Sequence, residues 1–210
     1  MSILERIKEI TIEGDAVKAE ELARTALDEG IAPNEIIQDG FIAAMTVVGE
    51  KFKNQEIFVP EMLRAARAMQ AGLKIIKPLV VSGEVKNLAR VVLGTVKGDL
   101  HDIGKNLVGM MMEGAGIEVI DLGIDVPVEK FVEAVKIHKP QILAMSALLT
   151  TTMPAMRSTI EALEAAGLRE NVKVLIGGAP VSQKFADEIG ADGYAANAGE
   201  AVDKVKELLQ

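Results

Sequence analysis

The sequence predicts two domains, a four-helix bundle over residues 1–86 and an α/β domain with a five-stranded parallel sheet over residues 87–210. Up to about residue 80, apolar residues recur at helical spacing, and glycine and proline mark the breaks. From residue 89 onward, short apolar runs alternate with amphipathic segments, as is typical of a parallel sheet covered by helices. A chain of 210 residues is long enough to bury a core in each domain.

The first domain is expected to contain four helices. Three breaks separate them: Gly14-Asp15, residues 30–34 and residues 54–60. Between these breaks, apolar residues return every three or four positions, as they do from Met62 to Ile76. Helices of this kind bury their apolar faces against one another in a bundle. The polar stretch 81–87 predicts a linker into the second domain.

The second domain is expected to contain five parallel strands. The strands are the apolar runs 89–96, 118–122, 142–148, 173–177 and 193–196. The helices that follow them are expected to begin near Ile103, Val128, Met153, Ser182 and Gly199. With right-handed crossovers, these elements form a flavodoxin-like (Rossmann-like) sheet of order 2-1-3-4-5. In such a sheet, ligands bind beyond the carboxyl ends of the first and third strands.

The composition argues against several classes of partner. The net charge is −8, with one tyrosine and no tryptophan, so we expect no nucleic-acid partner. No apolar run approaches the ~20 residues that span a bilayer, so we expect no membrane partner. The first residues do not resemble a secretory signal, and we expect a cytoplasmic location. Without cysteine, a bound metal must use nitrogen or oxygen ligands from the protein.

The most informative stretch is the loop 97–104, which directly follows the first predicted strand. It contains Asp99-x-His101-x-x-Gly104 and so places one of the two histidines beside a carboxylate. In an extended backbone, residues two positions apart point the same way. Asp99 would then bond one imidazole nitrogen while the other nitrogen faces a ligand. By itself, the same pattern also fits a solvated turn. The predicted topology brings this loop beside residues 146–152, which leave the third strand.

Three motifs stand in a fixed order along the chain: Asp99-x-His101-x-x-Gly104, then Ser146-x-Leu148 with Thr150 and Thr152, then Gly177-Gly178. Together they resemble the vitamin B12-binding module of cobalamin-dependent methyltransferase systems. Residues 45–52 and 58–61 further resemble the helical domain that caps the corrin in that family. The resemblance therefore covers nearly the whole chain, which is similar to corrinoid methyl-carrier proteins and to the helical-cap plus B12 domains of methionine synthase.

The resemblance implies an unusual ligation of cobalt. The benzimidazole of cobalamin leaves the metal, and His101 takes its place as the metal ligand. Asp99 would hydrogen-bond His101, and Thr152 would complete a proton relay. Further contacts would line the slot for the displaced nucleotide tail or the face of the corrin: Ser146, Leu148, Thr150, Gly177, Gly178, Ala198 and Gly104. Phe52 and Val59 would cap the methyl face from the helical domain.

Several of these residues also fit ordinary structural roles. Ser146 and Thr150 fit hydrogen bonding at the end of a strand. Thr152 fits the N-cap of the helix that follows it, because a proline stands at an early position of that helix. Phe52 and Val59 fit the core of the bundle. These alternatives stay open at the level of the sequence.

The resemblance implies a non-catalytic methyl-carrier subunit with cobalamin, in its methylcobalamin form, as cofactor. A substrate-specific methyltransferase would load the methyl group onto cobalt, and a corrinoid-dependent acceptor methyltransferase would pass it to tetrahydrofolate or a thiol. A reductive activation protein is a further expected partner. The sequence does not name the methyl donor, because the specificity for the donor belongs to the partner.

Four alternatives compete with a methyl carrier. A cobalamin-based sensor shares both domains but usually has an appended output domain, which we do not expect here. An isomerase-type B12 subunit shares the sheet domain, yet the helical cap favours methyl transfer. A metal-dependent hydrolase would use His101, Asp99 and Asp102, but such sites usually recruit further ligands. A receiver-type domain would use Asp99 as phosphoacceptor, but the acidic pair after the first strand is missing.

Overall fold

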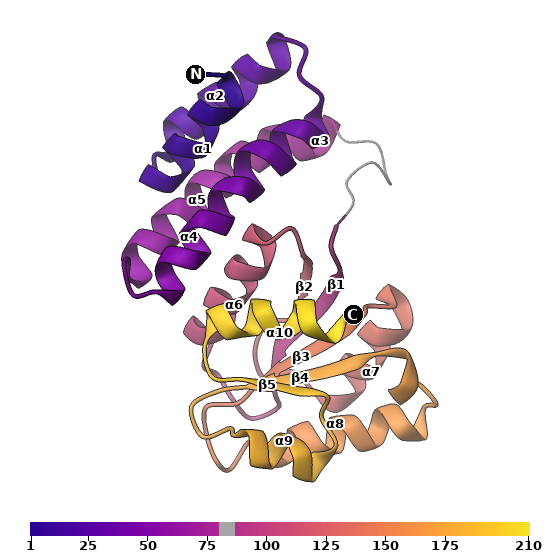
Figure 1. Ribbon diagram of the computed structural model, residues 1–210. Helices are drawn as coiled ribbons and strands as arrows, with labels where there is room; N and C mark the ends of the chain where they lie inside the picture. The colour runs from indigo at the N-terminus through magenta and orange to yellow at the C-terminus, as the bar shows by residue number, and fades with distance from the viewer. Residues whose placement is uncertain (80–86) are drawn as a thin grey trace. The chain divides into compact units, whose positions relative to one another are not determined.

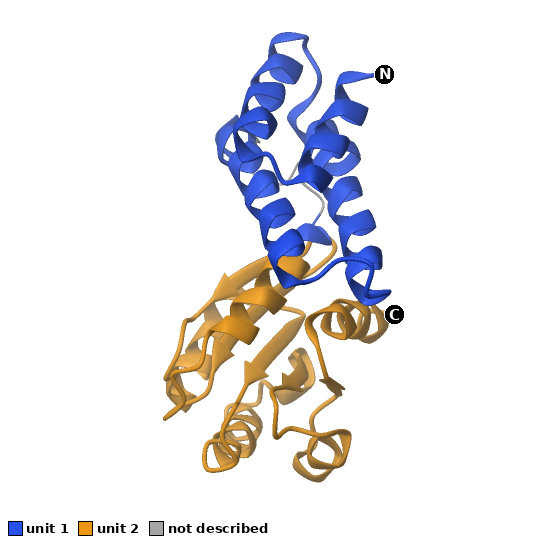
Figure 2. Cartoon of the chain, turned by 90° about the vertical axis from the view of Figure 1, so that its left-hand side faces the viewer, with its two compact units in different colours: residues 1–87, 114–116 blue, residues 88–113, 117–210 orange. Residues whose placement is uncertain are grey.

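The structure is a computed structural model that describes residues 1–79 and 87–210. The chain divides into two compact units (Figure 2): Met1–Asn87 with Gly114–Gly116, and Leu88–Glu113 with Ile117–Gln210. The predicted fold class, a helical region followed by a parallel α/β domain, is confirmed. The predicted linker over 81–87 lies outside the described residues except for Asn87, and the predicted boundary between residues 86 and 87 stays a prediction.

Within residues 1–79, the first unit contains the four helical stretches that the breaks predict (Figure 1). Their elements are α1 (Ile3–Glu13), α2 (Ala16–Asp28), α3 (Pro33–Glu35) continued by η1 (Ile36–Ile42) and α4 (Ala43–Lys53), and α5 (Val59–Ile76) with the short η2 (Lys77–Leu79). The first helix begins with a capping box between Ser2 and Glu5. It ends at Gly14, whose φ of +81° lies in the left-handed region that favours glycine.

One feature of the bundle was not predicted. The segment η1 is a π-helix, a conformation that is rare in proteins. It buries Gly40 and Phe41 together. A Cβ on Gly40 would lie 2.9 Å from Cγ2 of Ile7, and a Cβ on Gly72 would overlap the ring of Phe41. These contacts join segments far apart in the sequence, so local spacing does not reveal them.

The second unit contains a parallel sheet of the predicted order, β2-β1-β3-β4-β5. The strands are β1 (Arg90–Thr95), β2 (Glu118–Asp121), β3 (Ile142–Ser146), β4 (Lys173–Gly177) and β5 (Gly193–Ala195). The register pairs Thr95 with Ser146, and Ser146 with Gly177. The carboxyl ends of the three central strands are therefore level, and the loops that carry the three motifs leave from one edge.

Helices cover both faces of this sheet (Figure 1). They are α6 (Ile103–Gly114), α7 (Val128–His138), α8 (Pro154–Ala165), α9 (Gln183–Ile189) and α10 (Ala198–Leu208), with the short η3 (Arg169–Asn171) before β4. Each longer helix begins within one residue of its predicted start. One continuous core joins α7, α8 and α9 to the central strands. None of the helices in the described ranges has both the length and the apolar character that crossing a membrane requires.

The backbones after β3 and β4 approach each other closely. The amide of Ala147 donates to the carbonyl of Gly177 at 3.1 Å. A Cβ on Gly178 would overlap the carbonyl oxygen of Ala147, and φ at Gly178 is +128°. Glycine is therefore required here by the packing of the protein's own loops.

Candidate functional site

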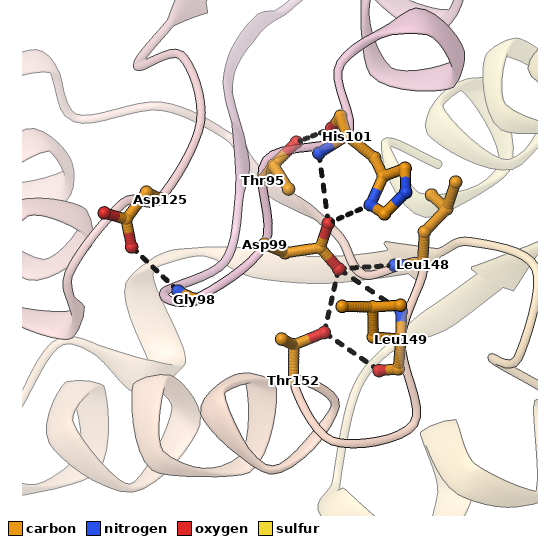
Figure 3. A network of polar contacts seen from close by, with 8 residues as sticks. All are labelled: Thr95, Gly98, Asp99, His101, Asp125, Leu148, Leu149 and Thr152. Carbon is orange, nitrogen blue, oxygen red and sulfur yellow. Dashed lines mark hydrogen bonds and ion pairs between the residues drawn. The ribbon is translucent and has the colours of Figure 1, made fainter.

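The centre of the site is the carboxylate of Asp99, which is fully buried. Its Oδ1 lies 2.7 Å from Nδ1 of His101 and accepts a second hydrogen bond, of 3.1 Å, from the backbone amide of His101 (Figure 3). The backbone amide and the ring Nδ1 of His101 therefore both contact Oδ1 of Asp99. This geometry fixes the position of the imidazole through the residue two positions before it, as the spacing of Asp99-x-His101 predicts.

The other oxygen of Asp99 connects this loop to the loop after β3. Oδ2 accepts from the backbone amides of Leu148 at 2.7 Å and Leu149 at 3.3 Å. It also accepts from the hydroxyl of Thr152 at 2.8 Å. One buried carboxylate thus holds together two segments that are about fifty residues apart in the sequence and adjacent only through the strand order.

The electrostatics of the pair determine which imidazole nitrogen is available. Burial alone raises the pKa of the Asp99 carboxyl, but hydrogen bonds from His101, Leu148 and Thr152 lower it well below its ordinary value. An ionised carboxylate only accepts hydrogen bonds, so Nδ1 of His101 carries a proton, and the neutral imidazole has its free lone pair on Nε2. The His101 side chain is 49% exposed. The site therefore presents one oriented nitrogen ligand.

The local sequence explains how the loop turns. Gly98 has φ of +83°, which glycine adopts without steric cost. The amide of Asp99 donates to the carbonyl of Val96 at 3.1 Å, closing a turn directly after β1. The buried hydroxyl of Thr95 donates to the carbonyl of His101 at 2.9 Å. The backbone on both sides of Asp99 is thereby held in place.

The alternative role of Thr152 as a helix N-cap is wrong. The N-cap position of α8 falls on Met153, one residue later. The hydroxyl of Thr152 instead lies 2.8 Å from both Asp99 Oδ2 and the carbonyl of Leu149. Since a hydroxyl has one proton, Thr152 donates to one of these oxygens at a time.

The remaining predicted residues lie at the same edge of the sheet but differ in their surroundings. Ser146 and Leu148 are half-buried, Thr150 is exposed, and Ala198 is buried at the first residue of α10. Gly177 and Gly178 face backbone, since their Cβ atoms would meet the carbonyl oxygens of Ala195 and Ala147 respectively. For Gly178 the close approach explains the glycine without any ligand.

The surface beside His101 is open and apolar. A Cβ on Gly104 would have no heavy atom from other parts of the described chain within 4 Å. Ile103 is 81% exposed, and Leu100 is also exposed. A flat apolar group has room to approach the backbone at this position, and the contact of Gly104 with the corrin stays a prediction.

In the helical unit, the break between α4 and α5 exposes apolar side chains. Phe52 is half-buried near the end of α4. Val59, the first residue of α5, is 39% exposed, so the alternative that it fills the bundle core is wrong. Sequence reasoning missed Phe58, which is 66% exposed at the N-cap position of α5. An aromatic residue at a position that normally takes a polar cap is a signal that the sequence contains.

The donor set fits a cobalt corrinoid. In the described ranges, no three His, Asp or Glu side chains gather in a way that would hold a metal ion by themselves. His101 offers a single nitrogen on an open apolar surface. One protein ligand suits a metal whose equatorial ligands belong to a macrocycle, and an orienting carboxylate on the far ring nitrogen is the usual support for such a histidine.

Comparison with known families agrees with this site. A B12 binding domain family model matches residues 89–203, and a second B12 binding domain model matches residues 3–77. The fold and the site thus define a cobalamin-binding protein. The chain belongs to the B12-binding domain family, and its cofactor is a corrinoid with cobalt. The predicted family and cofactor are confirmed.

Individual relatives resemble the chain over nearly its whole length. A trimethylamine corrinoid protein of Methanosarcina barkeri is 48% identical, over 99% of this chain and 96% of the relative. A dimethylamine corrinoid protein of Methanosarcina acetivorans is 50% identical, over 95% and 93%.

Two solved structures share the fold. A cobalamin-binding protein from Desulfitobacterium hafniense DCB-2 has a TM-score of 0.76 at 37% identity, covering 98% of each chain. The methanol:cobalamin methyltransferase complex from Methanosarcina barkeri has a TM-score of 0.90 at 32% identity, covering 99% of this chain and 79% of that one.

The buried hydrogen bonds of Asp99 predict the effect of Asp99→Asn. An amide has one accepting oxygen, so its NH2 group must face donors either at His101 or at Leu148 and Leu149. We expect the free energy of unfolding of the cofactor-free protein to fall by about 2 kcal/mol, measured by urea denaturation. Asp102→Asn, at an exposed carboxylate, is the control and should change it by less than about 0.5 kcal/mol. Equal effects of the two substitutions would contradict the structural role of Asp99.

Proposed function

We propose that this protein is a methyl-carrier subunit that works between two methyltransferases. A donor-specific methyltransferase loads the methyl group, and an acceptor methyltransferase removes it. When bound, the corrinoid supplies the cobalt that holds and releases the methyl group. The observation that carries the proposal is the half-exposed imidazole of His101, oriented through Nδ1 by a buried and ionised Asp99.

The chain's own residues tune and orient the ligand. His101 presents Nε2 to cobalt. The negatively charged carboxylate of Asp99 is hydrogen-bonded to Nδ1, and this makes Nε2 a better donor of its lone pair. The hydroxyl of Thr152 bonds the far oxygen of Asp99 and so keeps the carboxylate turned toward His101. Because the donors to Oδ2 include backbone amides, this arrangement does not depend on mobile side chains.

The loops at the sheet edge receive the rest of the cofactor. Ser146, Leu148 and Thr150, at the end of β3, would line the slot for the nucleotide tail. Gly177 and Gly178 after β4 and Ala198 at the start of α10 would bound the same slot. The level ends of β1, β3 and β4 support this assignment, since all three loops leave from one edge. Gly104, where a Cβ would meet no other atom of the described chain, would allow the corrin to approach the open apolar surface.

Electron paramagnetic resonance tests the ligation of cobalt directly. Protein labelled with ¹⁵N-histidine is reconstituted with unlabelled cobalamin and reduced to the Co(II) state. If His101 replaces the benzimidazole, the axial nitrogen splitting is a doublet from ¹⁵N. If the benzimidazole stays on the metal, the splitting is a triplet from ¹⁴N. We expect the doublet.

Two substitutions control this measurement. His101→Ala should abolish the doublet, because it removes the ligand. His138→Ala, which removes the other histidine, should leave the doublet unchanged, because His138 lies at the end of α7. A triplet in the labelled native protein would refute ligation by His101.

Methylamines are the proposed class of methyl donor. Relatives that are 48% and 50% identical over nearly the whole chain are named for trimethylamine and dimethylamine. The chain matched in the methanol:cobalamin methyltransferase complex is less similar, at 32% identity to this protein. The proposed acceptor enzyme methylates a thiol or tetrahydrofolate, and a reductive activation protein restores cobalt that has been oxidised.

A donor panel tests this assignment. The reduced, corrinoid-loaded protein is mixed with methyltransferases specific for trimethylamine, dimethylamine, monomethylamine or methanol, each with its substrate. Methylation is followed in the visible spectrum. We expect a methylamine enzyme to methylate the carrier at least about tenfold faster than the methanol enzyme, a difference of ~1.4 kcal/mol in transition-state binding. Faster transfer from methanol would overturn the donor class, and no transfer from any donor would overturn the carrier function.

The helical unit is proposed to shield the methyl group. Phe58 and Val59 are the exposed apolar residues at the start of α5, and Phe52 stands near the end of α4. With the cofactor bound, an apolar cap would keep water from the reactive cobalt–carbon bond.

Photolysis of bound methylcobalamin tests the cap. Phe58→Ala should accelerate photolysis, by about threefold or more, because the methyl radical escapes before it recombines; Phe58 is the most exposed of the three side chains. Phe52→Ala is the matched comparison and should have the smaller effect, since its side chain is half-buried. Native photolysis rates in both variants would remove these aromatic residues from the cap.

A further inference from the structure

The loop between β2 and α7 reaches the histidine loop at two backbone positions. Oδ1 of Asp125 accepts a hydrogen bond of 2.8 Å from the amide of Gly98 (Figure 3). The amide of Asp125 in turn donates to the carbonyl of Asp99 at 3.0 Å. One residue therefore holds the backbone on both sides of the peptide bond between Gly98 and Asp99. We call these two hydrogen bonds the Asp125 clamp.

The clamp depends on an uncommon backbone conformation. Asp125 has φ of +50°, in the left-handed region that non-glycine residues seldom adopt. Asp and Asn tolerate this region better than other non-glycine residues. In this conformation, the amide and the side chain of the same residue both point at the histidine loop.

Neighbouring hydrogen bonds hold the clamp itself in place. The amide of Thr95 donates to the carbonyl of Gly123 at 2.9 Å, and the amide of Val126 donates to the carbonyl of Thr95 at 3.0 Å. The side chain of Lys97 lies 3.2 Å from Asp125, and because the Lys97 side chain is exposed and that of Asp125 is partly exposed, this ion pair contributes little. The rigid part is the backbone on both sides of the clamp.

We propose that Asp125 is a positioning residue for His101, which fixes the turn at Gly98 and Asp99 before the cofactor binds. The inference rests on the proposed function in which His101 binds cobalt. A loop that is already ordered does not lose conformational entropy on binding, and small displacements of a ligand weaken a metal site. Asp99 sets the direction of the imidazole, and Asp125 sets the place of Asp99.

Two substitutions at residue 125 separate the side chain from the backbone conformation. Asp125→Gly retains the positive φ and the amide that bonds Asp99 but removes the acceptor for Gly98. Asp125→Asn retains the positive φ, the amide and a carbonyl oxygen as acceptor. Lys97→Gln removes only the ion pair. If the clamp positions His101, Asp125→Gly should be impaired, whereas Asp125→Asn and Lys97→Gln should resemble the native protein.

Two measurements report the result. In the cofactor-free protein, amide hydrogen exchange at Gly98 should accelerate by about fivefold in Asp125→Gly, as expected for the loss of one net hydrogen bond. In the cobalamin-loaded Co(II) protein labelled with ¹⁵N-histidine, the ratio of doublet to triplet signal should fall by about the same factor. In Asp125→Asn, both the exchange rate at Gly98 and the doublet-to-triplet ratio should match those of the native protein.

The outcomes distinguish the two proposals. A native doublet-to-triplet ratio in Asp125→Gly overturns the positioning role, even if exchange at Gly98 accelerates, because the clamp would then stabilise the loop without serving the ligand. Failure of Asp125→Asn to restore the ratio also overturns it. If the native protein itself shows no doublet, the proposed ligation by His101 fails, and the positioning role fails with it. The exchange measurement then still reports whether the clamp orders the loop.

Discussion

The site depends on one buried carboxylate. Asp99 is fully shielded from water, and removing an ion from water is costly unless directed donors replace its hydration. Here both oxygens are surrounded by donors from two loops: His101 on one side, and Leu148, Leu149 and Thr152 on the other. The same donors that keep the charge stable also hold the loops after β1 and β3 together. Stability of the loops and orientation of the ligand therefore have one cause.

The fold was predictable because its signals are local. Alternating apolar runs and helical segments indicated the five strands and a flavodoxin-like order, and they placed the starts of the five longer helices of the second domain to within one residue. The approach of Asp99 to Thr152 followed from the topology, since the first and third strands of such a sheet are neighbours. The π-helical segment η1 contains Gly40, which packs closely against Ile7, and Phe41, which packs against Gly72, and no local spacing in the sequence indicates these contacts.

Parts of the site were less predictable because they depend on contacts between segments that are far apart in the sequence. Thr152 stands two residues before a proline and matches a helix N-cap in sequence. Its hydroxyl instead lies within hydrogen-bond distance of the carboxylate of Asp99, which comes from a distant loop. Gly177-Gly178 suggested room for a ligand, whereas the structure shows backbone approaching backbone at Gly178. Asp125 has no sequence feature that links it to His101. Its role follows from a positive φ and two hydrogen bonds that only the folded loops bring together.

The distribution of donors around Asp99 also determines how the histidine responds to its ligand. Protonating Asp99 at Oδ2 would place a hydroxyl against the amides of Leu148 and Leu149, which only donate, and would require Thr152 to accept from Asp99 instead of donating to it. The arrangement of donors therefore favours the charged carboxylate. The hydrogen bond at Nδ1 is then charge-assisted, so the imidazole keeps one tautomer and one orientation. What changes between ligated and free histidine is then confined to Nε2, the nitrogen that faces away from Asp99.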